Sequence, residues 1–334
     1  MVTLELHKAN IRAIILHSLI LILQKMNKTF TLLALLISIA SFSQTPNYNS
    51  TDKRINAYRS SFWFEANLNG TIARYADSSV KFQYQLDLQY RRMSDANYVE
   101  GGNSANIFAD PAQHVYRPWI HYWIKPKTVR LSLSPIGYWG TWTPSKEGIQ
   151  LFYSEYRICP QVTFFQKIGR LEIQQRYRYE FRWLSNKETS KNNGGLADYA
   201  LGDNFLHNGE KMRLRYMLRL NLSLNGKSSG TKGSLYLAAW DELFVGIGAN
   251  TNNTKLLDQN RFVFLVGKYL KTKFPIKVEL GYTMQYVPKY DVSVPSGQMV
   301  GGPYDYGKLN WEMNNCFQVY FICDDFHSLF KKKK

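Results

Sequence analysis

The chain has 334 residues, and its 42 Lys and Arg outnumber its 25 Asp and Glu, so the formal net charge is +17. Aromatic residues make up 15% of the sequence while its mean hydropathy is −0.34, which favours β structure over a bundle of membrane helices. The basic residues are dispersed over many segments, and the sequence has neither a phosphate-binding G-x-x-x-x-G-K-S/T loop nor an RNA-binding aromatic motif. We therefore expect no nucleic-acid partner.

Residues 1–43 have the layout of an export signal. From Met26, a basic position is followed by an apolar run over residues 30–40 and then by small residues. We expect a secretory signal peptide that starts at Met26 and is cleaved before Gln44. Residues 1–25 form an N-terminal extension whose apolar run is too short to span a bilayer. The alternative is an N-terminal anchor that is not cleaved.

The rest of the chain is predicted to be an array of β-strands. Segment 80–91, V-K-F-Q-Y-Q-L-D-L-Q-Y-R, alternates apolar and polar side chains throughout, which is the period of a strand with two different faces. Segment 129–140 begins with the same period and loses it near Pro135 and Gly137, which predicts a bulge or bend. The predicted strands cover residues 62–69, 80–91, 114–124, 129–140, 152–164, 170–183, 212–224, 234–247, 260–270, 276–287 and 309–322.

The connections between these segments alternate between tight and long, as in a membrane barrel whose two rims face different compartments. The first and last predicted strands run in the same direction, so an even number of strands needs one more. We expect residues 44–60 to supply it, which gives about twelve strands, in a range of about 10 to 12. The long polar connections lie near residues 94–113, 185–210, 248–258 and 289–308.

Alternation alone fits both a soluble barrel with an apolar core and a membrane barrel with an apolar outer face. Strands of soluble proteins usually have about six residues, whereas twelve residues at about 3.3 Å each and a tilt near 45° rise about 28 Å, enough for an apolar band of about 25 Å. We therefore predict an antiparallel up-and-down transmembrane β-barrel over residues 61–323, with a basic tail at 324–334, in the lipid of the bacterial outer membrane. A soluble exported β-barrel that binds a ligand is the alternative.

In a membrane barrel the polar strand faces line the interior, where neighbouring guanidinium groups repel one another unless acids intervene. Glu180 is two residues from Arg178 and from Arg182 on the same face, and we expect Glu155 and Glu172 to serve the other arginines. Two interpretations stay open: an ion-pair ladder that rigidifies or plugs the barrel, and a basic lumen that attracts small anionic solutes through a narrow pore. The candidate residues for either are Glu155, Arg157, Arg176, Arg178, Glu180, Arg182, Arg213, Arg215, Arg219 and Arg261.

No metal, cofactor or disulfide is predicted. The three cysteines show neither a C-x-x-C pair nor a histidine at zinc-site spacing. Outer-membrane barrels that hydrolyse lipids resemble one another in a His-x-Ser pair on one strand face, and no histidine of this chain has Ser two residues later. We expect no enzyme, with a lipid-modifying enzyme as the alternative, and we expect His121 to point into the lumen.

Six segments carry a family resemblance: Y-S-E-Y-R-I-C-P-Q, Y-R-Y-E-F-R-W, R-L-R-Y-M-L-R-L, D-E-L-F, D-Q-N-R-F and V-E-L-G-Y-T-M-Q, which begin at residues 153, 177, 213, 241, 258 and 278. On them the chain resembles the outer-membrane β-barrel proteins called domain of unknown function 2490, which are frequent in Bacteroidetes. The resemblance covers most of the mature chain and implies an exported barrel without an established activity. The chain departs from the pattern in its long loops and in its tail, because such barrels usually end on an aromatic residue.

Overall fold

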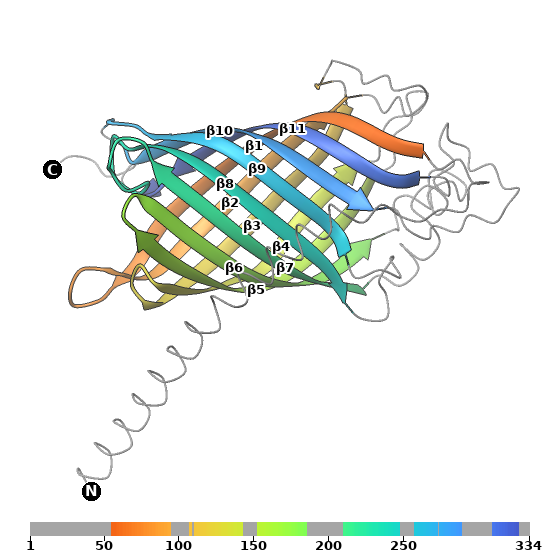
Figure 1. Ribbon diagram of the computed structural model, residues 1–334. Coiled ribbons are helices and arrows are strands. Elements are labelled where there is room, and N and C mark those ends of the chain that lie inside the picture. Colours follow the sequence, from red (N-terminus) through yellow and green to blue (C-terminus); the bar gives the residue numbers. More distant parts are fainter. Residues whose placement is uncertain are drawn as a thin grey trace, which may run out of the picture. The chain divides into compact units, whose positions relative to one another are not determined.

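Figure 1 shows the computed structural model of the chain, which describes residues 55–94, 107–108, 110–142, 152–185, 210–247, 257–272, 274–288 and 309–326. The described residues form a closed β-barrel, so the prediction of an all-β barrel is confirmed. Its eleven strands are β1 (Ile55–Arg74), β2 (Val80–Met93), β3 (Asp110–Lys125), β4 (Val129–Trp142), β5 (Phe152–Ile168), β6 (Leu171–Ser185), β7 (Glu210–Ser223), β8 (Leu235–Ile247), β9 (Leu257–Tyr269), β10 (Ile276–Pro288) and β11 (Leu309–Cys323).

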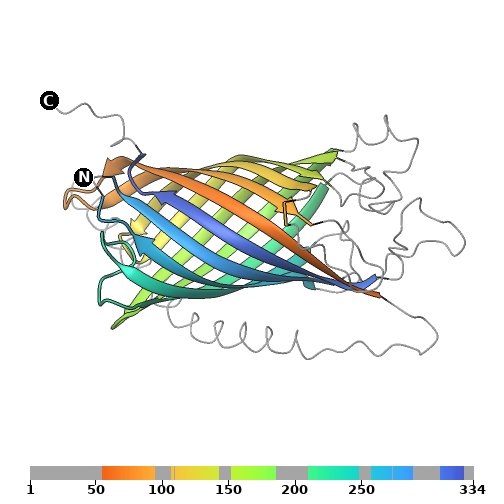
Figure 2. The same ribbon diagram turned by 90° about the horizontal axis from the view of Figure 1, so that it is seen from above.

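Each strand pairs antiparallel with the next one, and the barrel closes by a parallel pairing of β1 with β11. Figure 2 shows these two strands, orange and blue, side by side. Eleven lies in the predicted range of strand numbers, and the parallel closure is the departure from the predicted up-and-down pattern. Its reason is parity: with an odd number of strands joined by hairpins, the first and the last run in the same direction.

The N-terminal end of β1 lies within the segment 44–60 that we expected to supply a twelfth strand. Residues 55–60 instead continue β1, and they pair with the start of β11. Residues 44–54 lie outside the described residues, as do the predicted signal peptide and residues 327–334 of the tail. In the described part of the chain, no helix is long and apolar enough to cross a membrane.

A bulge in β4 bends the wall beside the interior. The pairing with β5 shifts register between Ser134 and Gly137, which confirms the predicted irregularity. A Cβ atom at Gly137 would lie 2.7 Å from the ring of Trp139, so only glycine lets this ring lie flat against the wall. The Trp139 ring in turn packs against Arg157, whose Cζ lies 3.9 Å from the ring centroid.

The two faces of the wall differ sharply in polarity. Large apolar side chains are exposed on the outer face, for example Ile120 at 49%, Leu222 at 45% and Phe264 at 50%. Arg178, Glu180 and their polar neighbours on the inner face are buried. The strands are also long, from 13 residues in β8 to 20 in β1. This distribution is the reverse of that in a soluble barrel, whose apolar side chains are packed inside.

One part of the inner face is apolar. A cluster of Met217, Tyr236, Ala238, Trp240, Val263, Leu265 and Tyr320 fills the interior beside β7, β8, β9 and β11. The ring of Tyr236 packs over its cross-strand partner Gly267, where a Cβ atom would lie 2.2 Å from the ring. The hydroxyl of Tyr236 donates a hydrogen bond to Glu279 (2.5 Å). The cluster therefore narrows the interior and anchors one of its carboxylates.

Candidate functional site: an arginine-lined cavity

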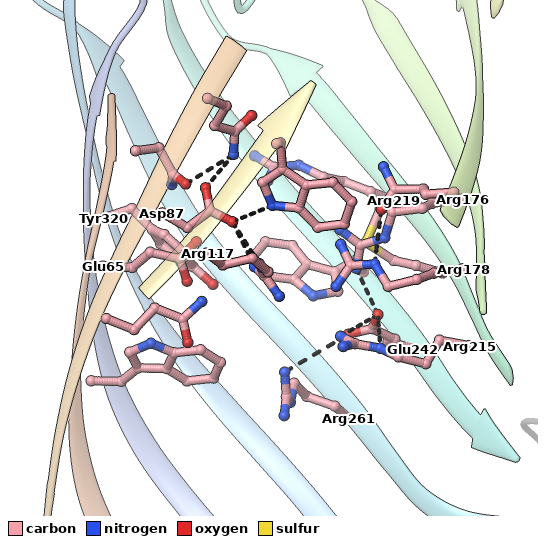
Figure 3. A pocket seen from close by; sticks show the side chains of 18 of the residues that line it. Glu65, Asp87, Arg117, Arg176, Arg178, Arg215, Arg219, Glu242, Arg261 and Tyr320 are labelled. Carbon is pink, nitrogen blue, oxygen red and sulfur yellow. Dashed lines mark hydrogen bonds and ion pairs between the residues drawn. The ribbon is translucent and has the colours of Figure 1, made fainter. Parts of the chain in front are cut away.

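A cavity of about 420 Å³ lies inside the barrel. Figure 3 shows side chains from several strands pointing into it, including Arg117 with Asp87 and Arg215 with Glu242. Four carboxylates line it, Glu65, Asp87, Glu242 and Glu279. Its ten arginines are Arg91, Arg117, Arg130, Arg157, Arg176, Arg178, Arg213, Arg215, Arg219 and Arg261.

Strand register explains why the arginines gather. In a strand, residues two apart share a face, and paired residues of neighbouring strands lie on the same side of the sheet. Arg178 of β6 pairs with Arg215 of β7, and Arg182 of β6 pairs with Arg157 of β5. All ten candidate residues therefore lie inside the barrel. Seven of them line the cavity, while Glu155, Glu180 and Arg182 do not line it but contact the others.

Glu180 is the most connected of the predicted acids. It is fully buried, and it accepts hydrogen bonds from Arg213 (2.6 and 2.9 Å) and from Arg215 (2.6 Å). Arg157 and Arg178 approach it to 3.5 and 3.9 Å. The predicted contact with Arg178 is thus present but long, and its main partners come from β7, the neighbouring strand.

The predicted pairing of Glu180 with Arg182 is wrong. Arg182 donates instead to Glu155 at 2.5 and 3.2 Å, and Arg157 donates to the same carboxylate at 2.7 and 2.9 Å. The carboxylate of Glu180 is occupied by Arg213 and Arg215 of β7, whereas Glu155 of β5 lies within range of both Arg182 and Arg157. Glu155 therefore serves two arginines, as expected.

Glu172 does not serve an arginine in the described part of the chain. It lies at the start of β6 and accepts hydrogen bonds from the hydroxyl groups of Ser228 and Ser229 and from the Ser229 backbone amide. Both serines belong to the turn between β7 and β8. Glu172 therefore stabilises this turn, and the expectation that it pairs with an interior arginine is wrong.

Three further carboxylates on predicted strands pair with interior arginines, and the sequence analysis missed them, as it missed Asp258, which accepts from Arg213 (3.0 Å). Glu242 accepts from Arg176 (2.6 Å) and Arg215 (2.7 Å). The other two are Asp87, which accepts from Arg117 (2.7 Å), and Glu279, which accepts from Arg219 (2.7 Å). Asp87 and Glu279 lie on the polar faces of predicted strands, so the alternation contained the signal for them, whereas the alternation loses its phase at residues 240–242 and did not mark Glu242. The same signal marks Arg91, Arg117 and Arg130.

Aromatic rings hold several arginines without neutralising them. The Cζ of Arg91 lies 3.4 Å from the ring centroid of Trp63, and the Cζ of Arg178 lies 4.7 Å from that of Trp119. Arg130 packs against Trp123 and Phe165, at 5.3 Å from each. A cation on an aromatic face is attracted by the ring but keeps its full charge. The arginine excess of the cavity is therefore only partly compensated.

The cavity wall also contains hydrogen-bond donors without acceptors. Among the described residues, Arg91, Arg130, Arg176 and Arg261 each have a buried Nε without an acceptor, as does Trp63 at its Nε1. A buried donor without a partner is costly unless water or a ligand satisfies it. The cavity is thus both cationic and short of acceptors.

His121 lines the cavity, in the position predicted from the alternation. Its Nδ1 lies 2.7 Å from the hydroxyl of Ser132, and its Nε2 lies 3.1 Å from Oε1 of Gln85. Ser132 is 6% exposed and is not among the residues that line the cavity. The pair has the elements of a base and a nucleophile, but the cavity gives no direct access to the hydroxyl.

Metal ligands do not gather in the described part of the chain. No group of three or more His, Cys, Asp and Glu there is placed to hold a metal ion. Cys159, Cys316 and Cys323 are buried and free. The chemistry of the site is therefore that of guanidinium groups, carboxylates and aromatic rings.

Comparison with known proteins gives one result. A family model described as "Protein of unknown function (DUF2490)" matches residues 60–292, which span β1 to β10. No curated protein and no solved structure matches the chain. The matched range contains all the arginines that line the cavity.

Proposed function

We propose that this chain, which belongs to the family DUF2490 of proteins of unknown function, is a bacterial outer-membrane β-barrel. Its basic interior attracts and passes small anionic solutes. One observation carries the proposal: the barrel exposes apolar side chains on its outer face and encloses an excess of arginine. The two parts of this observation support the location and the activity in turn.

The outer face supports a location in lipid. Exposure of apolar side chains such as Ile120 and Leu222 to water costs free energy, about 25 cal/mol for each Å² of apolar surface. Contact with the hydrocarbon of a membrane removes this cost. A strand of 13 residues rises about 30 Å at a tilt near 45°, which is enough to cross the apolar band of an outer membrane. Closure leaves no unpaired strand edge in the hydrocarbon.

Fractionation tests the location. We expect the protein to stay with outer membranes after carbonate washing and to migrate differently on gels before and after heating. A chain recovered in the wash, dissolved without detergent, would favour the soluble exported binding protein.

The interior supports attraction of anions. Ten arginines face the cavity with four carboxylates, and three more carboxylates, Glu155, Glu180 and Asp258, pair with these arginines without lining the cavity. Charge of one sign in a narrow space with walls of low dielectric raises the local concentration of counter-ions, and rings of Arg or Lys line pores for anions. The ion pairs of Glu155, Glu180 and Glu242 fix the wall, so the two interpretations of the arginines are compatible.

A planar bilayer with a KCl gradient tests the activity. We expect single-channel currents whose reversal potential has the sign of chloride selectivity. In the double variant Arg130→Gln and Arg178→Gln, the reversal potential should move toward zero because two weakly compensated charges are lost. The matched control, Arg170→Gln and Lys268→Gln, removes two exposed charges from a turn and from β9. Cation selectivity would contradict the proposal, and a folded barrel without current would favour a purely structural role.

A lipid-modifying enzyme is the alternative activity, and the His121–Ser132 pair is the observation that bears on it. A lipid hydrolysis assay on purified protein decides the question. We expect no turnover, because the buried Ser132 is not on the cavity wall. Turnover that is abolished by Ser132→Ala would establish the enzyme instead.

A further inference from the structure

Three hydrogen-bond donors without acceptors belong to side chains in mutual contact. They are Nε1 of Trp63, Nε of Arg91 and Nε of Arg261, all buried and all on residues that line the cavity. Trp63 is 4% exposed and Arg261 is 9% exposed. Such donors are normally satisfied in a folded protein, so the place calls for an acceptor that the chain does not supply.

Both guanidinium groups lie against the indole ring of Trp63. The Cζ of Arg91 is 3.4 Å from the ring centroid, and the Cζ of Arg261 is 4.9 Å from it. Arg91 and Trp63 come from the paired strands β2 and β1, whereas Arg261 comes from β9, which is separated from β1 in the wall by β10 and β11. The three side chains therefore meet across the interior.

Carboxylates compensate these two arginines only weakly. Arg91 donates to the neutral Oε1 of Gln89 (3.0 Å). The Glu242 carboxylate lies 3.8 Å from Arg261 and already accepts from Arg176 and Arg215 at shorter distances. Glu65 of β1 pairs in register with Gln89, and its charge acts on Arg91 from beyond the 4.0 Å of an ion pair in the described part of the chain.

The other unsatisfied arginines lack this combination. Arg176 also has an Nε without an acceptor, but it forms a 2.6 Å ion pair with Glu242. Arg130 packs against Trp123, which does not line the cavity. Two weakly compensated guanidinium groups around a shared indole N–H therefore occur together at Trp63.

We propose that Trp63, Arg91 and Arg261 form a binding site for a divalent oxoanion of the phosphate type. Guanidinium groups donate to phosphate oxygens from a planar fork, and these charge-assisted bonds are shorter and stronger than bonds between neutral groups. Water would supply acceptors but no compensating charge. The inference rests on the proposed function in that the anion reaches the site through the barrel interior.

Calorimetric titration of the refolded full chain in detergent with inorganic phosphate tests the site, at a mildly alkaline pH where phosphate is mostly a dianion. We expect saturable binding to wild type. Arg91→Gln and Arg261→Gln should each weaken it about tenfold or more, since each removes a charged donor. Trp63→Phe keeps an aromatic ring and loses the N–H, so it should weaken binding by a smaller factor. The control, Lys268→Gln, removes a charge from the exposed face of β9 and should change nothing.

Heat-modifiable migration on gels shows which variants are folded. Where a glutamine variant does not fold, Arg261→Lys decides, because it keeps the charge and loses the fork, and it should bind phosphate more weakly than wild type. Absence of binding to wild type, or equal binding by wild type, Arg261→Lys and Trp63→Phe, would overturn the site. Phosphate binding without any current in a bilayer would contradict the pore and leave the site intact, whereas anion current without phosphate binding would do the reverse.

Discussion

Glu180 shows at the residue scale how the interior tolerates so many arginines. Its carboxylate is fully buried, it accepts three hydrogen bonds from Arg213 and Arg215, and two further guanidinium groups lie within 3.9 Å. A buried charge is stable only when its partners are present, and removal of one partner leaves the others with less counter-charge. Glu180 is therefore a structural residue of the cavity wall.

Replacement of this carboxylate tests that role. Glu180→Gln should lower the free energy of unfolding by about 3–5 kcal/mol, because Arg213 and Arg215 lose their shared buried counter-charge and keep only Asp258 and Glu242, respectively. Urea unfolding in detergent micelles, followed by tryptophan fluorescence, measures the change. The control is Glu172→Gln, which contacts only serines of a turn and should cost about 1 kcal/mol. Equal losses in the two variants would contradict the account of Glu180.

The inner and outer faces of each strand could be read from the sequence, but the partners of each charge could not. Alternation placed Glu180, Arg178 and Arg215 on the inner face, where they lie. It could not show that Glu155 of β5 captures Arg182, because cross-strand pairing depends on the stagger between strands, which a single strand does not encode. The contact of Trp63 with Arg261 could not be predicted either, because β1 and β9 are not neighbours and the contact depends on how opposite walls meet.

The closing pair of β1 and β11 is the most unusual feature at the element scale. Their parallel register runs without a shift from Asn56 opposite Trp311 to Leu68 opposite Cys323. The expectation of a further strand came from the even strand numbers of bacterial barrels. The extension of β1 over residues 55–60 could not be predicted from the alternation, because these residues are less regular in polarity than the other segments.

A cysteine pair tests this seam. Ser61 lies directly opposite the buried, free Cys316, and both face the interior. Neighbouring strands are about 4.8 Å apart, within the range of Cα separations that a disulfide spans. Ser61→Cys should therefore cross-link to Cys316 under mild oxidation, seen as a mass loss of two hydrogens and a shift on non-reducing gels. Addition of Cys316→Ser should abolish the link. A failure to cross-link in the folded protein would place another strand between β1 and β11.

The whole molecule inverts the usual distribution of polarity. The outer face carries exposed residues such as Leu220 and Phe264, while the inner face carries ten arginines around a cavity. Composition, strand length and alternation were enough to predict a barrel with this inversion, because each strand keeps one period along its whole length. The size of the cavity and the apolar cluster of Trp240 and Tyr236 could not be predicted, since they depend on how opposite walls meet.

Nitroxide labels placed one at a time along β7 in proteoliposomes test the central claim most directly. The strand alternates outward residues such as Leu220 and Leu222 with inward residues such as Arg219 and Asn221. We expect collisions with lipid-soluble oxygen to follow a period of two over residues 217–222, with maxima at Leu218, Leu220 and Leu222. Maxima at Met217, Arg219 and Asn221, or the absence of any period, would contradict a barrel that is apolar outside and ionic within.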